Sequence, residues 1–354
     1  MRKFSLLLII AALFITALPS APSFAQDKPT KTMAEIVVDM ASAKDKPEFT
    51  ILLAAVKAAD PMFLKKLSDK ESTMTVFAPT DAAFGDLLKA LNLKAEDLLK
   101  NTALLNVVLA YHVVPGVALN AETVIAAKGA VVGTALPEHV LAIDVVGGKV
   151  KINDSTVATP DVMATNGVVH VVDKVLVPTD AMDLAKAMSS MMAATSDAMA
   201  AKPVSIAETV VGAASAKDKP EFTTLLAAVK AADPAVLKTL SSDGSYTVFA
   251  PTDAAFAAAL KKLNLTADKL LAGKDLTGIL LYHVVPGHIS SKTLVAAIGK
   301  TGVKVVTLSG GILSFNLKDG KVVINDGSTV AETDIQATNG TIHVIDSVLL
   351  PPTK

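Results

Sequence analysis

Residues 75–84 read TVFAPTDAAF, and the same ten residues recur without change at 247–256. Further stretches of the first half return in the second half at an offset of 171 to 173 residues. They are SAKDKPEFTILLAAVKAADP at 42–61, repeated with one change at 215–234, YHVVPG at 111–116 and 282–287, and NGVVHVVDKVLVP at 166–178, matched by NGTIHVIDSVLLP at 339–351. Solenoid units are only about 20–50 residues long, so this period predicts two copies of a whole domain.

Sequence patterns within each copy predict both helices and strands. In the first copy, residues 74–78 predict a strand that Pro79 ends, and Thr80 and Asp81 suit the N-cap and first turn of a following helix. Residues 140–146 and 149–153 predict a hairpin around Gly147-Gly148. Apolar side chains at helical spacing predict two buried helix faces, Phe49, Leu52, Leu53 and Val56 in the first and Phe84, Leu87, Leu88 and Leu91 in the second.

The composition excludes several classes of protein. The chain has 354 residues, 51% of them hydrophobic, and a formal net charge of -1. With 33 basic residues balanced by 34 acidic ones, it lacks the concentrated basic face of a nucleic-acid binder. The absence of cysteine removes disulfides, thiolate metal sites and cysteine nucleophiles. Two domains of this size can each bury a core without covalent cross-links.

The first 25 residues have the pattern of a secretory signal peptide. Arg2 and Lys3 precede an apolar stretch over 4–18, and Ser23-Phe24-Ala25 offers small residues for cleavage after Ala25. The alternative is an uncleaved membrane anchor, which the short apolar stretch disfavours. No later stretch reaches ~18 uninterrupted apolar residues, and no cysteine follows the signal for a lipid anchor. We therefore expect an exported protein, extracellular or periplasmic, with no membrane span in the mature chain.

A segment rich in alanine and methionine lies between the copies. We expect a first domain over 32–178, a helical linker over 179–203 and a second domain over 204–351, because the linker has no internal glycine or proline. Met188, Met191 and Met192 share one face of the predicted helix, and clustered thioethers can bind Cu(I). Packing against a domain, or low-complexity composition alone, explains the same cluster and is favoured.

Three of the four repeated stretches resemble motifs of the fasciclin domain. The stretches at 75–84 and 247–256 are similar to its first motif, Tyr111-His112 and Tyr282-His283 to its central motif, and residues 166–173 and 339–346 to its closing motif. The resemblance covers nearly all of both copies. It implies an α+β fold of two fasciclin-like domains, each a wedge of two β-sheets with helices packed alongside. It also implies a role in cell adhesion or matrix interaction, as in periostin-like proteins.

The resemblance further suggests which residues contact a partner. In animal members, contact with integrins is ascribed to an Asp-Ile pair just before the closing motif and to the Tyr-His region. The matching residues in this chain are Asp161, Val162, Asp334 and Ile335, together with Tyr111, His112, Tyr282 and His283. We take these eight residues as candidates for binding a partner.

The residues predict no catalytic or cofactor site, and no metal site beyond the linker methionines. No His-Glu-x-x-His run exists, so the repeated histidines are expected to be buried and hydrogen-bonded to the backbone, with metal binding as the alternative. Asp81 and Asp253 each have an explanation at a helix start, and no second acid lies nearby in sequence for acid–base catalysis.

Two functional hypotheses follow from these observations. The first is a non-enzymatic adhesion or matrix-interaction protein, whose two joined modules bind a cell-surface or matrix protein or a polysaccharide. The alternative is a carrier of an apolar small molecule, a pigment or a lipid, outside the cell or in the periplasm. A deep apolar pocket is expected only for the carrier.

Overall fold

The computed structural model describes residues 29–45, 47–91, 93–181, 204–216, 220–242, 244–273, 275–299 and 301–352. The predicted signal peptide, nearly all of the predicted linker and the cluster of Met188, Met191 and Met192 lie outside these residues.

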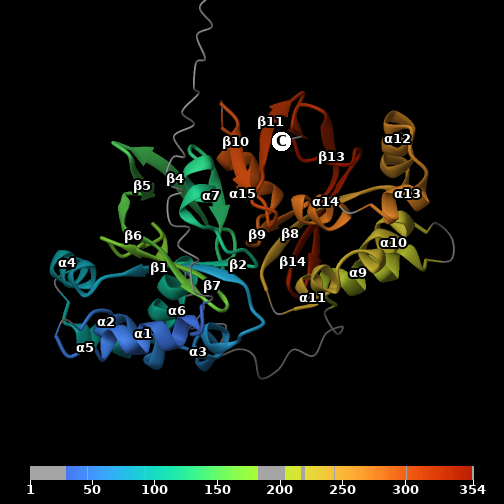
Figure 1. The fold of residues 1–354 in the computed structure, drawn as a ribbon. Coiled ribbons are helices and arrows are strands. Elements are labelled where there is room, and N and C mark those ends of the chain that lie inside the picture. Colours follow the sequence, from blue (N-terminus) through green and yellow to red (C-terminus); the bar gives the residue numbers. More distant parts are fainter. Residues whose placement is uncertain are drawn as a thin grey trace, which may run out of the picture.

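Both copies contain the same kinds of element in the same order (Figure 1). The first copy contains α1 (Met33–Ala41), α2 (Thr50–Ala58), α3 (Pro61–Ser68), β1 (Met74–Pro79), α4 (Asp81–Leu91), α5 (Ala95–Lys100), α6 (Thr102–Tyr111), β2 (Val113–Pro115), α7 (Ala121–Ala126), β3 (Val131–Gly133), β4 (Val140–Val146), β5 (Lys149–Ile152), β6 (Ser155–Ala164) and β7 (Gly167–Val172). The second copy contains α9 (Ile206–Ala214), α10 (Thr223–Ala231), α11 (Pro234–Ser241), β8 (Tyr246–Pro251), α12 (Asp253–Leu263), α13 (Ala267–Leu271), α14 (Leu276–Tyr282), β9 (Val284–Pro286), α15 (Ser291–Ile298), β10 (Val303–Val306), β11 (Ile312–Lys318), β12 (Lys321–Ile324), β13 (Ser328–Ala337) and β14 (Gly340–Ile345). The repeated sequence therefore encodes a repeated fold.

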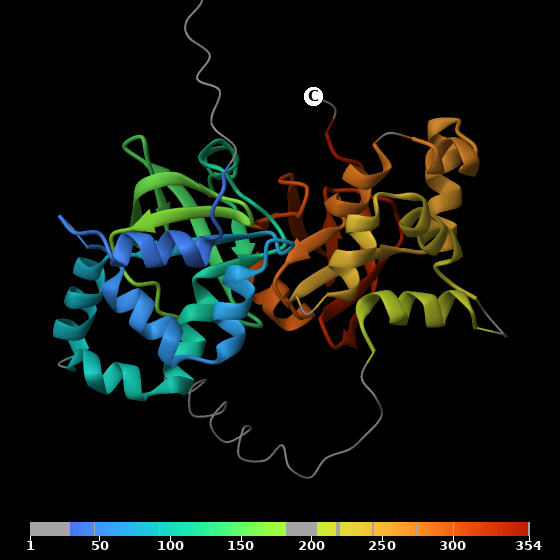
Figure 2. The ribbon, with the colours of Figure 1, turned by 60° about the horizontal axis from the view of Figure 1, so that its bottom comes forward.

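The strands are hydrogen-bonded in one continuous order, β2-β1-β7-β6-β5-β4-β3-β10-β11-β12-β13-β14-β8-β9. The long strand β6 pairs with β5 only through Ser155 and Thr156 and with β7 from Val157 onward, so two sheets share this strand. Strand β13 joins two sheets in the same way. Helices α1, α2, α3, α5 and α6 gather below β1, β6 and β7 in Figure 1, and Figure 2 shows the two halves side by side. The mixed helix-and-strand fold expected from the sequence is confirmed.

The repeated TVFAP stretch forms a central, fully buried strand in each half. Strand β1 pairs antiparallel with β2 and parallel with β7, and all six of its residues are buried. A strand buried on both faces is expected to carry a nearly continuous apolar run. The hydroxyl of Thr75 is accommodated because it donates to the Val117 carbonyl and accepts the Leu119 N–H, both at 2.8 Å. The predicted strand is confirmed and extends through Pro79.

Helix α4 begins where the sequence predicts. The Thr80 hydroxyl accepts the Ala83 N–H at 3.1 Å, as an N-cap should. The predicted buried face is wrong at its far end, because Leu91 is 50% exposed. Burial in α4 is confined to its first two turns (Ala83, Phe84 and Leu88), and the last turn projects past the core into solvent.

Helix α2 begins one residue later than the apolar spacing predicts. Phe49 was expected inside the helix, but it is the N-cap residue, with a left-handed φ of 66°. Its side chain is nevertheless fully buried. Spacing reports which side chains point to the core, whereas the backbone conformation at the helix start is set by the preceding turn. The equivalent Phe222 has the same conformation, with φ 64°.

We expect Gly85→Ala to stabilise the first domain by about 0.5–1 kcal/mol, because alanine loses less backbone freedom on folding than glycine inside a helix. Gly85 lies in the middle of α4, and an added Cβ would meet nothing within 4 Å. Ala257 already occupies the equivalent position of α12. Urea unfolding followed by far-UV circular dichroism would measure the change, and a lower midpoint than in the wild type would contradict it.

The two halves are in direct contact along β3 and β10. Val131 of β3 pairs with Val305 of β10 in parallel orientation, which joins the strands of the two halves. Gly133 lies so close to the second half that an added Cβ would be 1.8 Å from the Pro286 carbonyl oxygen. Glycine is needed here because the two backbones approach each other too closely for a side chain.

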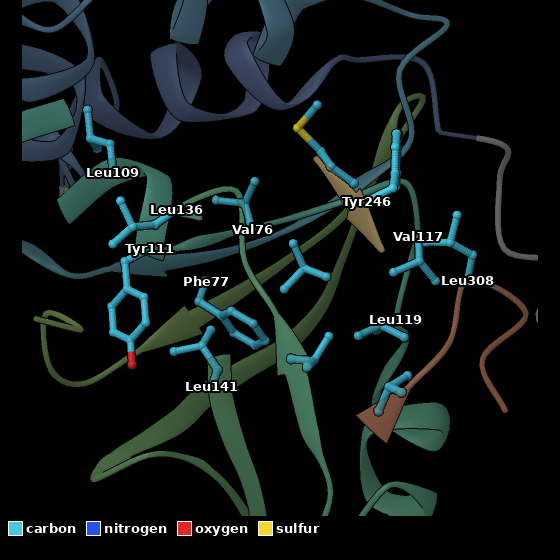
Figure 3. Close-up of a cluster of buried hydrophobic side chains, with 14 of the residues drawn as sticks. Val76, Phe77, Leu109, Tyr111, Val117, Leu119, Leu136, Leu141, Tyr246 and Leu308 are labelled. Atoms are coloured by element: carbon cyan, nitrogen blue, oxygen red, sulfur yellow. The ribbon is translucent and has the colours of Figure 1, made fainter. Parts of the chain in front are cut away.

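Apolar side chains of both halves also share one cluster, part of which is drawn in Figure 3. Tyr246 and Leu308 from the second half lie beside Val117 and Leu119 from the first. A Cβ added to Gly116 would lie 2.7 Å from the Tyr246 ring and 3.1 Å from Leu308. The apolar contact and the strand pairing together place the two domains in one packed unit.

Candidate functional site

The histidine of each Tyr-His motif is buried and holds two backbone groups. His112 is 3% exposed; its Nδ1 lies 2.7 Å from the Val108 carbonyl, and its Nε2 accepts the Leu176 N–H at 2.9 Å. His283 repeats this arrangement with Ile279 at 2.8 Å and Leu349 at 2.9 Å. The imidazole therefore ties the end of one helix to the segment after the last strand of its domain. The expectation of buried, backbone-bonded histidines is confirmed for this pair.

Burial controls the charge of these two histidines. It lowers the pKa of His112 to about 4, although the bond to the Val108 carbonyl acts in the opposite direction. The pKa of His283 is lowered to about 4 for the same reason. Both imidazoles are consequently neutral at pH 7, with the proton on Nδ1 donated to a helix carbonyl.

The tyrosine of each motif is also largely buried, and its hydroxyl bonds to the first strand of the hairpin in its domain, β4–β5 or β11–β12, and to the residue that follows the second strand. The Tyr111 hydroxyl donates to the Val140 carbonyl at 3.1 Å and accepts from the Asn153 side chain at 2.9 Å. Tyr282 makes the same contacts with Ile312 at 2.8 Å and Asn325 at 3.2 Å. Burial raises the pKa of the Tyr111 hydroxyl, with the Asn153 bond opposing it, so the phenol stays protonated.

The aspartate of each Asp-Ile or Asp-Val pair occupies a bulge in a long strand and bonds to a helix start. Asp161 has a left-handed φ of 57°, and its carboxylate accepts the Ala121 N–H at the start of α7 at 2.7 Å. Asp334 has φ 64° and accepts the Ser291 N–H at the start of α15 at 2.8 Å. The Ser291 hydroxyl also donates to Asp334.

The electrostatics at Asp334 favour the ionised form. Burial alone would raise the pKa of Asp334, but the two bonds from Ser291 outweigh it and hold the pKa below its ordinary value. A buried histidine bonds to the backbone of each bulge. The Asp161 N–H donates to Nδ1 of His170 and the Asp334 N–H donates to Nδ1 of His343, both at 3.3 Å. Val162 and Ile335, which follow the aspartates, are half-buried.

The structure thus divides the eight candidate residues into two groups. Tyr111, His112, Tyr282 and His283 are buried inside the domains. Asp161, Val162, Asp334 and Ile335 reach the surface in part, beside α7 and α15. The two groups lie at different places in each domain, and the Tyr-His pair does not join the Asp pair in one site.

Asp81, which the sequence placed at its own helix start, also serves a second helix. Its carboxylate accepts the N–H of Thr50 at 3.0 Å and of Ile51 at 2.9 Å, at the start of α2. Asp253 makes the same bonds to Thr223 at 3.0 Å and Thr224 at 2.8 Å. Within the described residues, histidines and carboxylates form no group of three or more that could hold a metal ion.

Two clefts open between the halves. One has a volume of about 330 Å³ and is lined by apolar side chains including Met62, Phe63 and Val113, with His288 and Lys66 at its wall. A neighbouring cleft of about 460 Å³ contains the ion pair of Lys238 with Glu71, which links the two halves. Inside the second half, the apolar cavity under α9, α10 and α11 is only about 40 Å³, close to the space of one water molecule.

Comparison with known families assigns both halves. The model of the fasciclin domain matches residues 47–178 and 220–351, which hold every repeated motif except the start of the 42–61 stretch and its counterpart. The chain belongs to the fasciclin family. Its two fasciclin domains account for the identical element order of the two halves and for the buried Tyr-His pair in each.

Individual known proteins are similar to parts of this chain. Protein sll1483 of Synechocystis is 50% identical over 132 residues, which cover 37% of this chain and 68% of that protein. Human periostin is 26% identical over 205 residues, 58% of this chain but only 20% of periostin. A solved structure of a FAS1 domain pair from the insect cell adhesion molecule Fasciclin I covers 85% of this chain and 96% of that one, at 20% identity and a TM-score of 0.34.

Sequence reasoning missed one residue at the boundary between the fasciclin domains. Glu138 comes from the first domain, and its carboxylate bonds to Ser290 and Thr293 of the second. The motif comparison gave no signal for it, because Glu138 lies in a stretch where the two copies do not match.

Proposed function

We propose that this chain is an exported, non-enzymatic adhesion protein that uses two tandem fasciclin domains to bind a cell-surface or matrix partner. The observation that carries the proposal is the presence of two complete fasciclin domains with similarity to periostin. The bonding of the motif residues supports it, because His112, His283, Asp81 and Asp253 are each engaged by backbone groups rather than facing a cleft together. Among the described residues, no helix has the length and apolar character needed to cross a membrane.

We infer that each domain begins ahead of the matched ranges, at residues 32 and 204. Asn166 supports this limit because its side chain accepts the first N–H of α1, from Met33, at 3.0 Å and donates to the Leu67 carbonyl at 3.0 Å. Asn339 binds α9 in the same way, through the Ile206 N–H at 2.8 Å. Helices α1 and α9 therefore form part of the domains.

We place the partner contact at Asp161-Val162 and Asp334-Ile335, with the buried Tyr-His pairs supporting the domains from inside. Val162 and Ile335 pack in part against the core and in part reach the surface beside a fixed bulge, so their outer faces offer a contact surface. The docked arrangement of the domains supports one combined surface rather than two independently moving ones.

The test is binding of the secreted full-length protein to cells, matrix proteins and polysaccharides by biolayer interferometry. We expect the double variant Val162→Ser/Ile335→Ser to bind about tenfold more weakly, the effect of losing a central apolar contact. Val145→Ser is the matched control, because Val145 on β4 is also half-buried and packs in part against the core, but lies outside the proposed surface. Absence of binding to every surface would refute adhesion, and an equal loss in the control would refute the placement.

The cleft of about 330 Å³ supports a second candidate, the carrier of an apolar small molecule. Small-molecule sites usually occupy about 300–1,000 Å³, so this cleft is large enough, whereas the cavity of about 40 Å³ inside the second domain is far too small for a pigment or lipid. Native mass spectrometry of protein purified from its own host distinguishes the two functions. A bound pigment or lipid would favour the carrier, and a mass equal to that of the polypeptide would count against it.

A further inference from the structure

Residues 134–139, the loop between β3 and β4, dock the first domain on a helix of the second. The Glu138 carboxylate accepts the Ser290 N–H at 3.0 Å, the Ser290 hydroxyl at 2.7 Å and the Thr293 hydroxyl at 2.5 Å. Its backbone N–H donates to the His288 carbonyl at 2.7 Å. Ser290 is the N-cap of α15, so a side chain of one domain completes the start of a helix in the other.

The backbone at Glu138 indicates that this contact carries a cost. Its φ is 64°, in the left-handed region that non-glycine residues rarely adopt. The equivalent loop of the second domain has Gly310, with φ 78°, where no such strain arises. Strain of this kind persists where the surrounding contacts require the side chain. The first domain therefore has a glutamate at a positive φ, where the shorter corresponding loop of the second domain has a glycine.

The corresponding loop of the second domain, between β10 and β11, contacts the first domain without a carboxylate. Gly310 faces α7 of the first domain, where an added Cβ would be 3.5 Å from the Thr123 methyl carbon. Helix α7 is capped from its own chain segment, since the Asn120 side chain accepts the Thr123 N–H at 2.9 Å. Each domain thus presents the same loop to the helix of the other, and only the loop with Glu138 bonds through a charged group.

We propose that Glu138 is an acid-sensitive clasp between the two fasciclin domains, which holds them docked while it is ionised and releases them when it is protonated. The proposal concerns the relative placement of the domains and stands independently of any adhesion partner. A protonated carboxyl loses its attraction for the positive end of α15 and one of its acceptor sites. Because Gly133 and Pro286 meet backbone to backbone beside the clasp, even a small separation would break the strand pairing next to them.

The charged groups around Glu138 set the pH at which release is expected. His288 faces it, with Nε2 3.7 Å from the carboxylate, while His343 on β14 interacts with it electrostatically and Asp334 on β13 binds the first turn of α15 through Ser291. On its own loop, His139 pairs with Asp180 at 3.0 Å.

The pKa of Glu138 indicates whether docking is lost at low or at high pH. Burial would raise it, but the bonds from Thr293 and Ser290, together with His288, hold it below the ordinary value of 4.5. Docking is therefore fully present above pH 4.5 and is lost as the pH falls through the lowered value.

Single-molecule energy transfer on the full-length chain tests the clasp. Because the chain has no cysteine, Lys89→Cys on α4 and Lys261→Cys on α12 give one dye site in each domain. We expect one docked population at pH 7 and a second, more separated population below pH 4.5. In Glu138→Gln the ratio of docked to separated molecules should fall at least about tenfold at pH 7, and acid should add little, because the charged acceptor is already gone.

Three variants provide controls. Glu138→Gly installs the residue of the second domain, so loss of docking in it would show that the carboxylate, not the loop shape, holds the pair. Gly133→Ala should separate the domains at every pH by blocking the close approach to Pro286. Glu71→Gln removes the exposed ion pair with Lys238 and should leave docking unchanged. Circular dichroism confirms that each variant is folded. Docking in Glu138→Gln that equals the wild type at pH 7, or acid opening that persists in it, would overturn the proposal.

Discussion

Replacing Gly167 by alanine should destabilise the first fasciclin domain by about 3 kcal/mol or more, which is a large share of the stability of a small domain. Gly167 pairs with Met74 where the central parallel strands begin, and its φ is 134°. An added Cβ would lie 1.9 Å from the Met74 carbonyl oxygen. The clash is with backbone of a buried strand, so no side-chain rotation relieves it. Urea unfolding followed by far-UV circular dichroism measures the loss.

A matched variant separates the clash from the unusual dihedral angle. Gly147→Ala also places alanine at a positive φ, 59°, but its Cβ would meet nothing within 4 Å. We expect it to cost only about 1 kcal/mol. Gly340→Ala should repeat the large effect in the second domain, since its Cβ would be 1.8 Å from the Tyr246 carbonyl oxygen. Equal losses in Gly167→Ala and Gly147→Ala would refute the role assigned to the close approach.

As the pH falls from 6.5 to 4, His112 or His283 alone should destabilise its domain by about 3 kcal/mol, and the buried His170 and His343, whose pKa values are also lowered, should add to the loss. The folded pKa of His112 is about 4, whereas an unfolded histidine has its ordinary value of 6.5. The unfolded chain binds the proton first, so the free energy of unfolding falls with decreasing pH across this window, by up to about 1.4 kcal/mol per pH unit. His283 gives the same expectation for the second domain.

Buried or hydrogen-bonded carboxylates also make the free energy of unfolding depend on pH, but in a lower pH range than the histidines. The pKa values of Asp69, Asp173, Asp253 and Asp334 are lowered in the folded protein. For such groups the stabilisation is present above the unfolded pKa and is lost only as the pH falls through the folded one. The histidine effect is therefore separable between pH 6.5 and 4.5, before these carboxylates titrate.

The variant His112→Gln tests the assignment. It should cost about 1–3 kcal/mol at pH 7, because the Val108 carbonyl and the Leu176 N–H no longer share one well-placed partner. The pH slope of the first domain should then become shallower, keeping the part that His170 contributes, while the slope of the second domain remains unchanged. Hydrogen-exchange mass spectrometry between pH 4.5 and 7 reports the two domains separately. An unchanged slope in peptides of the first domain would show that another group titrates there.

The strongest sequence signals concern contacts that are local or repeated. The identical TVFAPTDAAF stretches predicted a buried strand, an N-cap and a helix start, because proline, threonine and aspartate act within a few residues of their own position. The buried role of His112 could also be anticipated, since a histidine inside an apolar stretch needs backbone partners. Its distant partner, the Leu176 N–H, could not be identified from spacing.

Other features depend on tertiary structure that no local pattern contains. Leu91 fits a helical stripe but is exposed, because the core ends before the last turn of α4. Phe49 fits the stripe of α2 but adopts a left-handed conformation just outside it. Glu138 reaches a serine 152 residues away, and the bond exists only because the two domains dock. The partner-binding candidates remain predictions, with their aspartates now placed at the starts of α7 and α15.

The junction of β3 and β10 has a further consequence for solubility. Unpaired strand edges invite pairing with other chains, and natural proteins keep such edges short or interrupt them with proline. In the described residues, the strand order ends at β2 and β9, which are three residues long and finish at Pro115 and Pro286. Undocking would expose two additional edges, including the apolar β10, and make aggregation dependent on protein concentration. Joining the domains edge to edge thus protects the chain from self-association as well as fixing its shape.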